Sequence, residues 1–336
     1  MIPEGSAIWR LVTAMLGEDR AGDVLAVMAI DPRLGECARQ PSRAQIAMAL
    51  NIVLFADLLT RVASAAAYVA DVRAKGRTIC FDHGALRTID GPSGALPAGA
   101  AAFSRILEPL GYAVAGTYPL PKLTMTGRAF AHRDMAESVP QFFVSELHVA
   151  QLPEAARDAA RRIFDASVDP LDEAEREMLG RLARDGRCLF EAALAGLPGV
   201  VASFGRHHET PALADYETMR SATAEGAWIA TEGNVFNHAT DRVPDVTALA
   251  AQLRQRGFPL KPEVEVSANG RVRQTAFLAG KVIRQFRAGD GSLTQREVPG
   301  SFYEFISRDV DPATGRLDLS FDSGNATGIF AVTGAP

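Results

Sequence analysis

The spacing of apolar residues predicts helices over most of the first 76 residues. Between Ser42 and Gly76 the apolar side chains recur on a broad face, as in a helix that packs against a larger body. Ser42 suits the N-cap of this stretch, and Gly76 suits its C′ position. We therefore predict that residues 1–76 form an N-terminal helical segment packed on the core.

After residue 76 the pattern changes to short runs of β-branched and aromatic residues. Residues 77–89 read as a strand and residues 98–112 as a helix, and three more short strands follow before residue 150. This β-α-β-β-β order defines a first module over residues 77–150. Residues 151–232 return to helical periodicity, and we interpret them as a helical insertion.

Residues 233–336 repeat the β-α-β-β-β order as a second module followed by a C-terminal tail. The repeat is one of element order and not of residues. Its centre is a predicted hairpin around Asn269-Gly270, a sequence typical of a type I′ turn. The last residues, 319–336, are a candidate for a flap over a site. The alternation of strand-rich and helix-rich segments predicts an α+β fold.

Composition narrows the class of protein. The chain is 47% hydrophobic and 22% charged, and its net charge of −5 argues against nucleic acid as a partner. Cys37, Cys80 and Cys188 are too few and too scattered for a disulfide framework, which favours a reducing compartment. The longest nearly apolar run, residues 46–56, is interrupted by Asn51 and is too short for a membrane span. We expect a cytoplasmic protein without a membrane partner.

The first candidate for chemistry lies in the strand CFDHGALRT. Because side chains alternate along a strand, Phe81, His83, Ala85 and Arg87 are expected to share one face. A face that carries both a histidine and an arginine is a poor core. It suits a site that holds a metal and a carboxylate, since arginine binds carboxylates bidentately.

The corresponding strand of the second module, VFNHATDRV, also contains a histidine. His238 is expected to point to the same side as Phe236 and Thr240. Equivalent strands that each direct a histidine inward indicate a shared site and not two surface residues.

A late strand supplies a carboxylate. Glu304 lies in SFYEFIS between aromatic and apolar neighbours, so it is expected to be buried and to need a cation or donors nearby. Two histidines and one carboxylate form the facial triad of non-haem Fe(II) oxygenases, which leaves coordination positions for substrate and O₂. We predict that His83, His238 and Glu304 bind a metal.

The segments FDHGALRT, NVFNHATDRV and SFYEFISRD, with GTYPLPKLTMTGRAFAHRD and PQFFVSELH between them, resemble the 2-oxoadipate dioxygenase/decarboxylase family of the vicinal oxygen chelate superfamily. The resemblance implies paired βαβββ modules that form a curved mixed sheet around a metal site, with added N-terminal and central helices. It implies Fe(II) as the cofactor, held by His83, His238 and Glu304, and Arg87 as a catalytic, substrate-binding residue. The partners it implies are a 2-oxo acid and O₂: 2-oxoadipate would become 2-hydroxyglutarate and CO₂ in lysine catabolism.

Three alternatives stay open from the residues alone. His132 and Asp134 match the His-x-Asp pattern of jelly-roll 2-oxoglutarate oxygenases, which also use Fe(II). A vicinal-oxygen-chelate protein can bind a metal or a ligand without turnover. An extradiol-type or isomerase-type enzyme can use the same metal triad. We expect structural roles for His148, His207 and His208.

Overall fold

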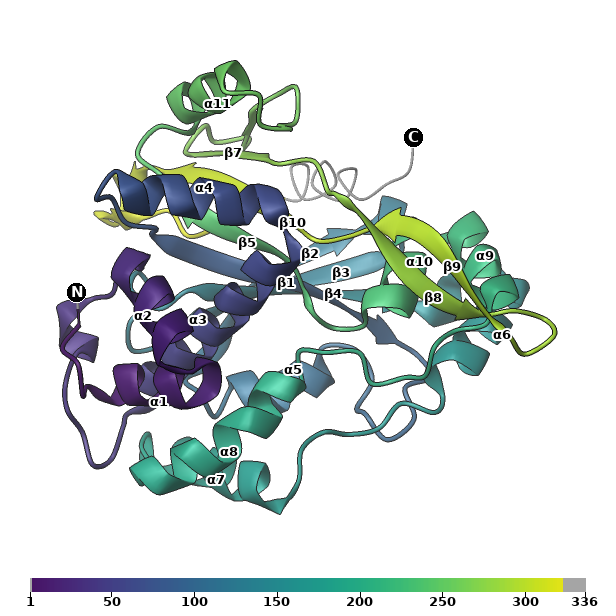
Figure 1. The fold of residues 1–336 in the computed structure, drawn as a ribbon, viewed down its shortest axis with the longest axis horizontal. Coiled ribbons are helices and arrows are strands. Elements are labelled where there is room, and N and C mark those ends of the chain that lie inside the picture. Colours follow the sequence, from purple (N-terminus) through teal and green to yellow (C-terminus); the bar gives the residue numbers. More distant parts are fainter. Residues whose placement is uncertain (1, 323–336) are drawn as a thin grey trace.

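The computed structural model describes residues 2–322, and its central feature is a mixed eight-stranded sheet (Figure 1). The strand order is β2-β3-β4-β1-β5-β10-β7-β6. The strands of the sheet are β1 (Phe81–Asp90), β2 (Tyr112–Leu120), β3 (Met125–His132), β4 (Gln141–His148), β5 (Phe236–Arg242), β6 (Glu265–Val266), β7 (Val272–Ala276) and β10 (Phe302–Arg308).

The two halves of this sheet have matching topologies. In the first half β1 pairs with β4 in parallel, and β3 and β2 follow antiparallel. In the second half β5 pairs with β10 in parallel, and β7 and β6 follow antiparallel. The antiparallel pair of β1 and β5 joins the halves. Each half contains one crossover helix, α5 (Ala101–Leu107) or α11 (Val246–Gln255). The predicted α+β fold of paired βαβββ modules is confirmed.

Four helices form the N-terminal segment: α1 (Ala7–Leu16), α2 (Glu18–Val27), α3 (Arg43–Arg61) and α4 (Ala63–Ala74). Helices α3 and α4 contact β5 and β10 of this sheet, and α1 and α2 pack on these helices. Helix α3 begins with a capping box in which Ser42 and Gln45 satisfy each other's backbone N–H groups. By length and composition α3 could span a membrane, but 78% of its apolar window is buried inside the fold. Its apolarity therefore reflects a position in the core.

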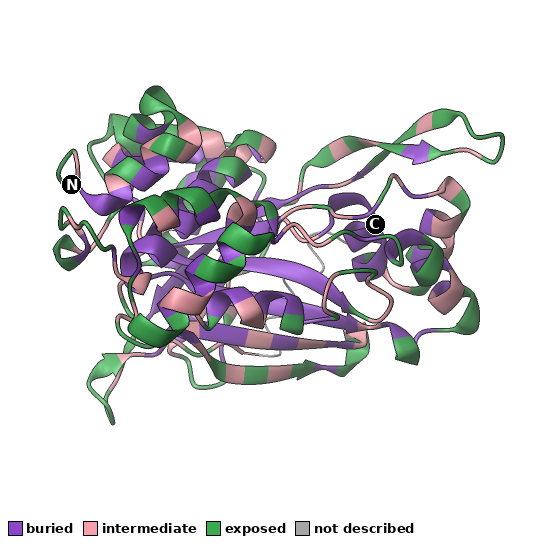
Figure 2. Ribbon diagram, turned by 90° about the horizontal axis from the view of Figure 1, so that it is seen from below, coloured by how far each residue is buried: buried purple, intermediate pink, exposed green. Residues whose placement is uncertain are grey.

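Five helices lie between the two modules, and an additional hairpin lies inside the second. The helices are α6 (Glu154–Phe164), α7 (Glu173–Asp185), α8 (Phe190–Ala202), α9 (Leu213–Ala222) and α10 (Ala224–Glu232). Strands β8 (Lys281–Arg287) and β9 (Leu293–Pro299) form a separate two-stranded sheet. This hairpin extends over α9 and α10 (Figure 1), and most of its residues are exposed (Figure 2). A short pair, β11 (Val310–Asp311) and β12 (Arg316–Leu317), follows β10.

Two β-bulges interrupt the pairing of the central strands β1 and β5. In β1 an extra residue, Asp82, lies between two consecutive partners on β5. In β5 the extra residue is Asn237. A bulge reverses the alternation of side chains on its strand at that point. Each bulge residue immediately precedes a histidine of the predicted site.

The bulges overturn part of the predicted face assignment. Phe81 was expected beside His83, but its ring packs on Phe55 of α3 with centroids 5.1 Å apart, on the opposite face of the sheet. Phe236 was expected beside His238, but it packs on Phe81, with centroids 6.5 Å apart. Simple alternation failed at both positions because each strand contains an extra residue between the phenylalanine and the histidine.

The predicted hairpin at Asn269-Gly270 exists, but its turn type was wrong. Strands β6 and β7 pair antiparallel, and Gly270 has a positive φ of 73°. Among the described residues Thr124 is the only non-glycine with positive φ, so Asn269 does not adopt the conformation that a type I′ turn requires. Instead, the Gly270 N–H donates to the Ser267 carbonyl at 2.8 Å, and the loop is longer than two residues.

Candidate metal centre

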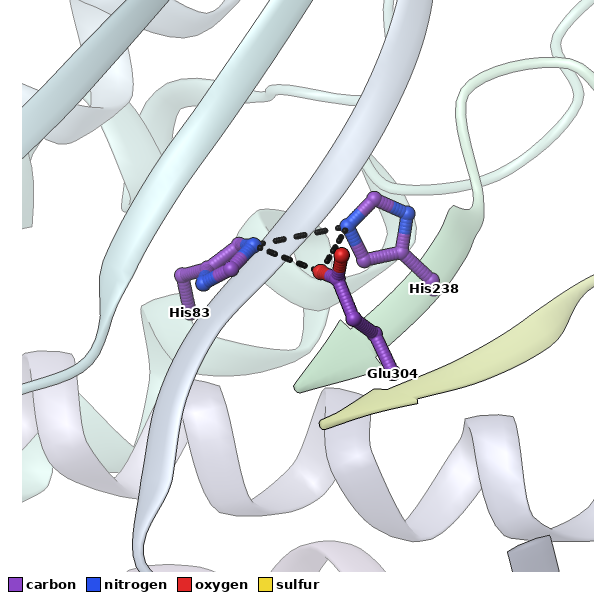
Figure 3. A group of neighbouring side chains, drawn as sticks. All are labelled: His83, His238 and Glu304. Carbon is purple, nitrogen blue, oxygen red and sulfur yellow. Dashed lines mark hydrogen bonds and ion pairs between the residues drawn. The ribbon is translucent and has the colours of Figure 1, made fainter. Parts of the chain in front are cut away.

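His83, His238 and Glu304 converge on one point, although 221 residues separate the first from the last (304 − 83). Figure 3 shows both imidazoles and the carboxylate pointing toward one another from β1, β5 and β10. Glu304 Oε2 lies 3.2 Å from His83 Nε2 and 3.3 Å from His238 Nε2, and the two nitrogens are 3.4 Å apart. All three side chains are buried. This donor set and spacing suit a single divalent cation.

The bulge residues orient the two histidines. Asp82 Oδ1 lies 2.9 Å from His83 Nδ1, and the Asn237 amide lies 3.0 Å from His238 Nδ1. In each module the bulge brings the residue before the histidine to the histidine's side of the strand. Hydrogen bonds at Nδ1 fix the ring and leave Nε2 as the coordinating atom, which is the usual arrangement around metal-bound histidines.

The polar atoms around the triad fit a bound cation. Glu304 Oε1 and Asn237 Oδ1 are buried, and no hydrogen-bond partner for either atom lies among residues 2–322. A bound metal would interact with Glu304 Oε1. The positions of the oxygen and nitrogen in an asparagine amide are assigned from hydrogen bonding. With the Asn237 amide rotated so that these two atoms exchange places, its oxygen would accept the Nδ1 proton of a metal-bound His238. The donor set therefore suits a metal ion better than a purely protein-satisfied core.

The charges in the site also favour a cation. Burial by itself raises the pKa of Glu304, but His238 and His83 hold it below its ordinary range. Burial opposes protonation of His83, yet Asp82 and Glu304 raise its pKa above the usual value. Burial lowers the pKa of His238 and keeps this ring neutral. Two carboxylates thus draw one positive charge, a proton or a metal, to the coordinating nitrogens.

Thr240 supports the carboxylate ligand from β5. Its Oγ1 donates to Glu304 Oε2 at 2.7 Å and lies 3.1 Å from His83 Nε2. Thr240 is fully buried, so water does not compete with its hydroxyl for this carboxylate oxygen.

The triad opens into a cavity with mixed walls. The side chains that line it beside the triad are apolar or carry neutral and acidic polar groups: Ala85, Phe143, Ser145, Asn237, Gln274, Phe321 and Asp322. Two of them, Phe321 and Asp322, belong to the segment predicted as a flap. Residues 323–336 of that segment lie outside the described residues.

Arg87, the predicted substrate-binding arginine, lies deeper than the cavity wall. Its guanidinium pairs with Glu225 at 2.8 Å and lies 4.8 Å from the Trp228 ring centre. Among the described residues the cavity lining reaches Ala85, two positions earlier on the same face of β1, but does not include Arg87. Its positive charge still reaches the metal site, where it adds to the effect of burial in lowering the pKa of His238.

The His132–Asp134 alternative does not form a metal site. Arg43 binds both Asp134 oxygens at 2.7 Å. His132 Nδ1 accepts the backbone N–H groups of Asp134 and Met135, and burial lowers the pKa of His132 to about 4. The parallel pairs β1–β4 and β5–β10 are also foreign to a jelly roll.

The other histidines make structural hydrogen bonds. His148 lies between Asp90 and Thr126, at 2.9 and 2.8 Å. His208 Nε2 is 2.9 Å from the Ala230 carbonyl, and His207 Nε2 is 3.4 Å from the Ser203 carbonyl. Within residues 2–322 the triad is the one group of three or more potential ligands close enough to share an ion.

The sequence analysis placed Thr240 on the same side as His238 without giving it a role, and it missed Asp82 and Asn237, although a signal for these two is present. FDHGALR (81–87) and FNHATDR (236–242) share the pattern Phe-Asx-His-x-x-x-Arg. The two modules therefore repeat residues as well as element order, contrary to the prediction. An Asx residue before each histidine is the trace of the repeated bulge.

Comparison with known proteins places this arrangement in context. The profile of a family described as 2-oxoadipate dioxygenase/decarboxylase matches residues 47–317. A curated protein of Arabidopsis thaliana named 2-oxoadipate dioxygenase/decarboxylase, chloroplastic, is 24% identical over 215 residues. That match covers 58% of this chain and 51% of the Arabidopsis protein, so the chain spans about half the length of this relative.

Solved structures share the fold. A glyoxalase superfamily protein from Ralstonia eutropha JMP134 is 49% identical, with a TM-score of 0.91 over 95% of this chain and 99% of that one. The hydroxyglutarate synthase of Oryza sativa, solved in complex with 2-oxoadipate, is 21% identical, with a TM-score of 0.67 over 87% and 93% of the two chains. The hydroxyglutarate synthase of Pseudomonas putida is 18% identical, with a TM-score of 0.55 over 99% and 74%.

Proposed function

The chain belongs to the 2-oxoadipate dioxygenase/decarboxylase family, and from this premise we propose that it is an Fe(II)-dependent dioxygenase and decarboxylase of a 2-oxo acid. The proposed reaction converts 2-oxoadipate and O₂ to 2-hydroxyglutarate and CO₂, a step of lysine catabolism. The observation that carries the proposal is the convergence of His83, His238 and Glu304 on one point that opens into a cavity.

Iron bound by the triad would supply the redox chemistry and the coordination positions for a 2-oxo acid and O₂. The chain's own residues would orient and enclose the reactants. Asp82 and Asn237 fix the imidazoles, and Thr240 fixes the carboxylate ligand. Phe143 and Phe321 supply apolar walls that limit access of water.

Polar groups of the cavity would meet the carboxylates of the substrate. Ser145 and Gln274 line the cavity and can donate hydrogen bonds. We propose Arg87 as a carboxylate-binding residue, because it follows His83 and Ala85 on one face of β1 and its positive charge helps to lower the pKa of His238. Its pairing with Glu225 means that a substrate carboxylate would share the guanidinium with that side chain.

The proposal is tested by loading the chain with Fe(II) without oxygen and then following O₂ uptake with 2-oxo acids of graded length. We expect uptake with 2-oxoadipate, with one CO₂ and one 2-hydroxyglutarate formed for each O₂ consumed. His238→Ala should abolish uptake because it removes a ligand, whereas His148→Ala, outside the site, should retain it. Iron binding without O₂ uptake for any 2-oxo acid would favour a non-catalytic binding protein.

A further inference from the structure

Arg308 and Asp82 form a charged pair next to the metal site, where Asp82 contacts the Nδ1 atom of His83. The side chain of Arg308, at the end of β10, is fully buried, and so is that of Asp82. Arg308 Nε donates to both Asp82 oxygens at 3.1 and 3.0 Å, and Nη2 donates to Oδ1 at 2.9 Å. Because the guanidinium is planar and makes two-point contact, it fixes the rotation of the carboxylate that holds His83.

The same guanidinium holds the chain that leads to the cavity wall. We call residues 318–322 the strap. Arg308 Nη1 donates to the carbonyl oxygens of Asp318 and Ser320, at 2.9 and 2.7 Å. The Phe321 ring lies 5.1 Å from the Arg308 guanidinium carbon. One side chain therefore contacts the strap at three residues, Asp318 and Ser320 through hydrogen bonds and Phe321 through its ring.

The strap places an aromatic ring against a metal ligand. The Phe321 ring meets the His83 ring edge-on, with centroids 4.8 Å apart at 88°. It also packs on Phe143, and its backbone N–H donates to the Tyr118 hydroxyl at 3.1 Å. His83 is thus held on one side by Asp82 and on another by Phe321, and Arg308 contacts both of these residues.

We propose that Arg308 is a positioning residue for the metal centre, which fixes His83 through Asp82 and closes the cavity by pinning the strap with Phe321 against the site. The inference rests on the proposed metal binding by the triad. Under this proposal, movement of the strap and the order of His83 are linked. Release of the strap would remove two carbonyl acceptors and an aromatic ring from Arg308, and Arg308 would then hold Asp82 and His83 less firmly. Access of substrate past Phe321 and the order of the metal site are coupled through one side chain.

A purely structural ion pair would stabilise the fold without affecting metal affinity in the folded protein. The test therefore measures metal affinity directly, by titrating the full chain with Co(II) and following the visible absorption of the bound ion. Folded protein is verified by circular dichroism. The variants are Arg308→Gln, which removes the charge, and Arg308→Lys, which keeps the charge but not the planar fork. Arg273→Gln is the matched control, because Arg273 also binds an aspartate, Asp309, through two bonds, at 2.8 and 2.6 Å, but on the surface.

We expect Arg308→Gln to weaken Co(II) binding by about 10- to 100-fold, the usual loss when an outer partner of a metal ligand is removed. Arg308→Lys should show a smaller loss, and Arg273→Gln none. Limited chymotrypsin digestion should cleave after Phe321 faster in both Arg308 variants than in the wild type, because the strap is less firmly held.

Wild-type Co(II) affinity in folded Arg308→Gln would overturn the inference. If that variant does not fold, wild-type affinity in Arg308→Lys would overturn it instead. Failure of the wild-type chain to bind Co(II) would reject the metal site itself. Binding by the wild type with unchanged affinity in the variants would reject only the role of Arg308.

Discussion

Thr240→Val tests whether the Glu304 carboxylate is held ready for a cation. The substitution preserves the shape of the side chain and removes one donor, the hydroxyl 2.7 Å from Glu304 Oε2. Thr240 is fully buried, so water cannot replace the lost donor. A hydrogen bond to a charged group contributes about 1.5–3 kcal/mol to stability, and we expect the metal-free variant to lose that much free energy of unfolding.

The sheet offers a matched control for this substitution. Thr275, on β7 beside β10, is also fully buried, but its hydroxyl donates to a neutral acceptor, the Glu263 carbonyl, at 3.1 Å. Loss of a neutral hydrogen bond costs about 0.5–1.5 kcal/mol. Thr275→Val should therefore cost about 1 kcal/mol less than Thr240→Val.

Urea unfolding of the metal-free proteins measures both costs, and Co(II) titration measures the consequence for the site. Thr240→Val should bind Co(II) about 10- to 100-fold more weakly, as expected when a partner of a metal ligand is lost. Thr275→Val should bind it like the wild type. Equal costs of unfolding together with equal Co(II) affinities would refute the view that Thr240 supports a ligand.

Further predictions concern the bulged strands, the helices, pH and the metal. In Gly84→Ala the added Cβ would lie 2.3 Å from Phe236 Cζ, so urea unfolding should show a loss of about 1–3 kcal/mol in the free energy of unfolding. Gly22 lies on the open face of α2, so Gly22→Ala should raise the free energy of unfolding by up to about 1 kcal/mol. Burial raises the pKa of Asp241 to about 7, so its protonated form stabilises the fold fully below about pH 4 and this contribution is lost as pH rises through 7. Asp241→Asn should therefore gain stability relative to the wild type between pH 5 and 8, and a constant difference would contradict this assignment. Metal at 100 times its Kd should raise the free energy of unfolding of the wild type by about 2.7 kcal/mol, and His83→Ala should remove this gain; chelation should reverse it.

The chain by itself determined the repeated element order and the three candidate ligands. Strand and helix periodicities are local properties, so the β-α-β-β-β order could be derived from the spacing of apolar residues. Polar residues within apolar strands can be recognised from the sequence, because they are costly to bury without a partner. The glutamate between aromatic residues and the histidine in each equivalent strand are such residues. These features predicted His83, His238 and Glu304 without knowledge of strand pairing.

Only the tertiary structure decided which side chains accompany the ligands. The bulges at Asp82 and Asn237 arise from the register between β1 and β5, strands about 150 residues apart in the chain, and period-2 reasoning along one strand cannot detect an extra residue. Arg308 reaches Asp82 across 226 positions, and Arg87 finds Glu225 on a helix outside its module. Such pairings depend on how separate elements pack, because the sequence around a charged residue does not identify its partner.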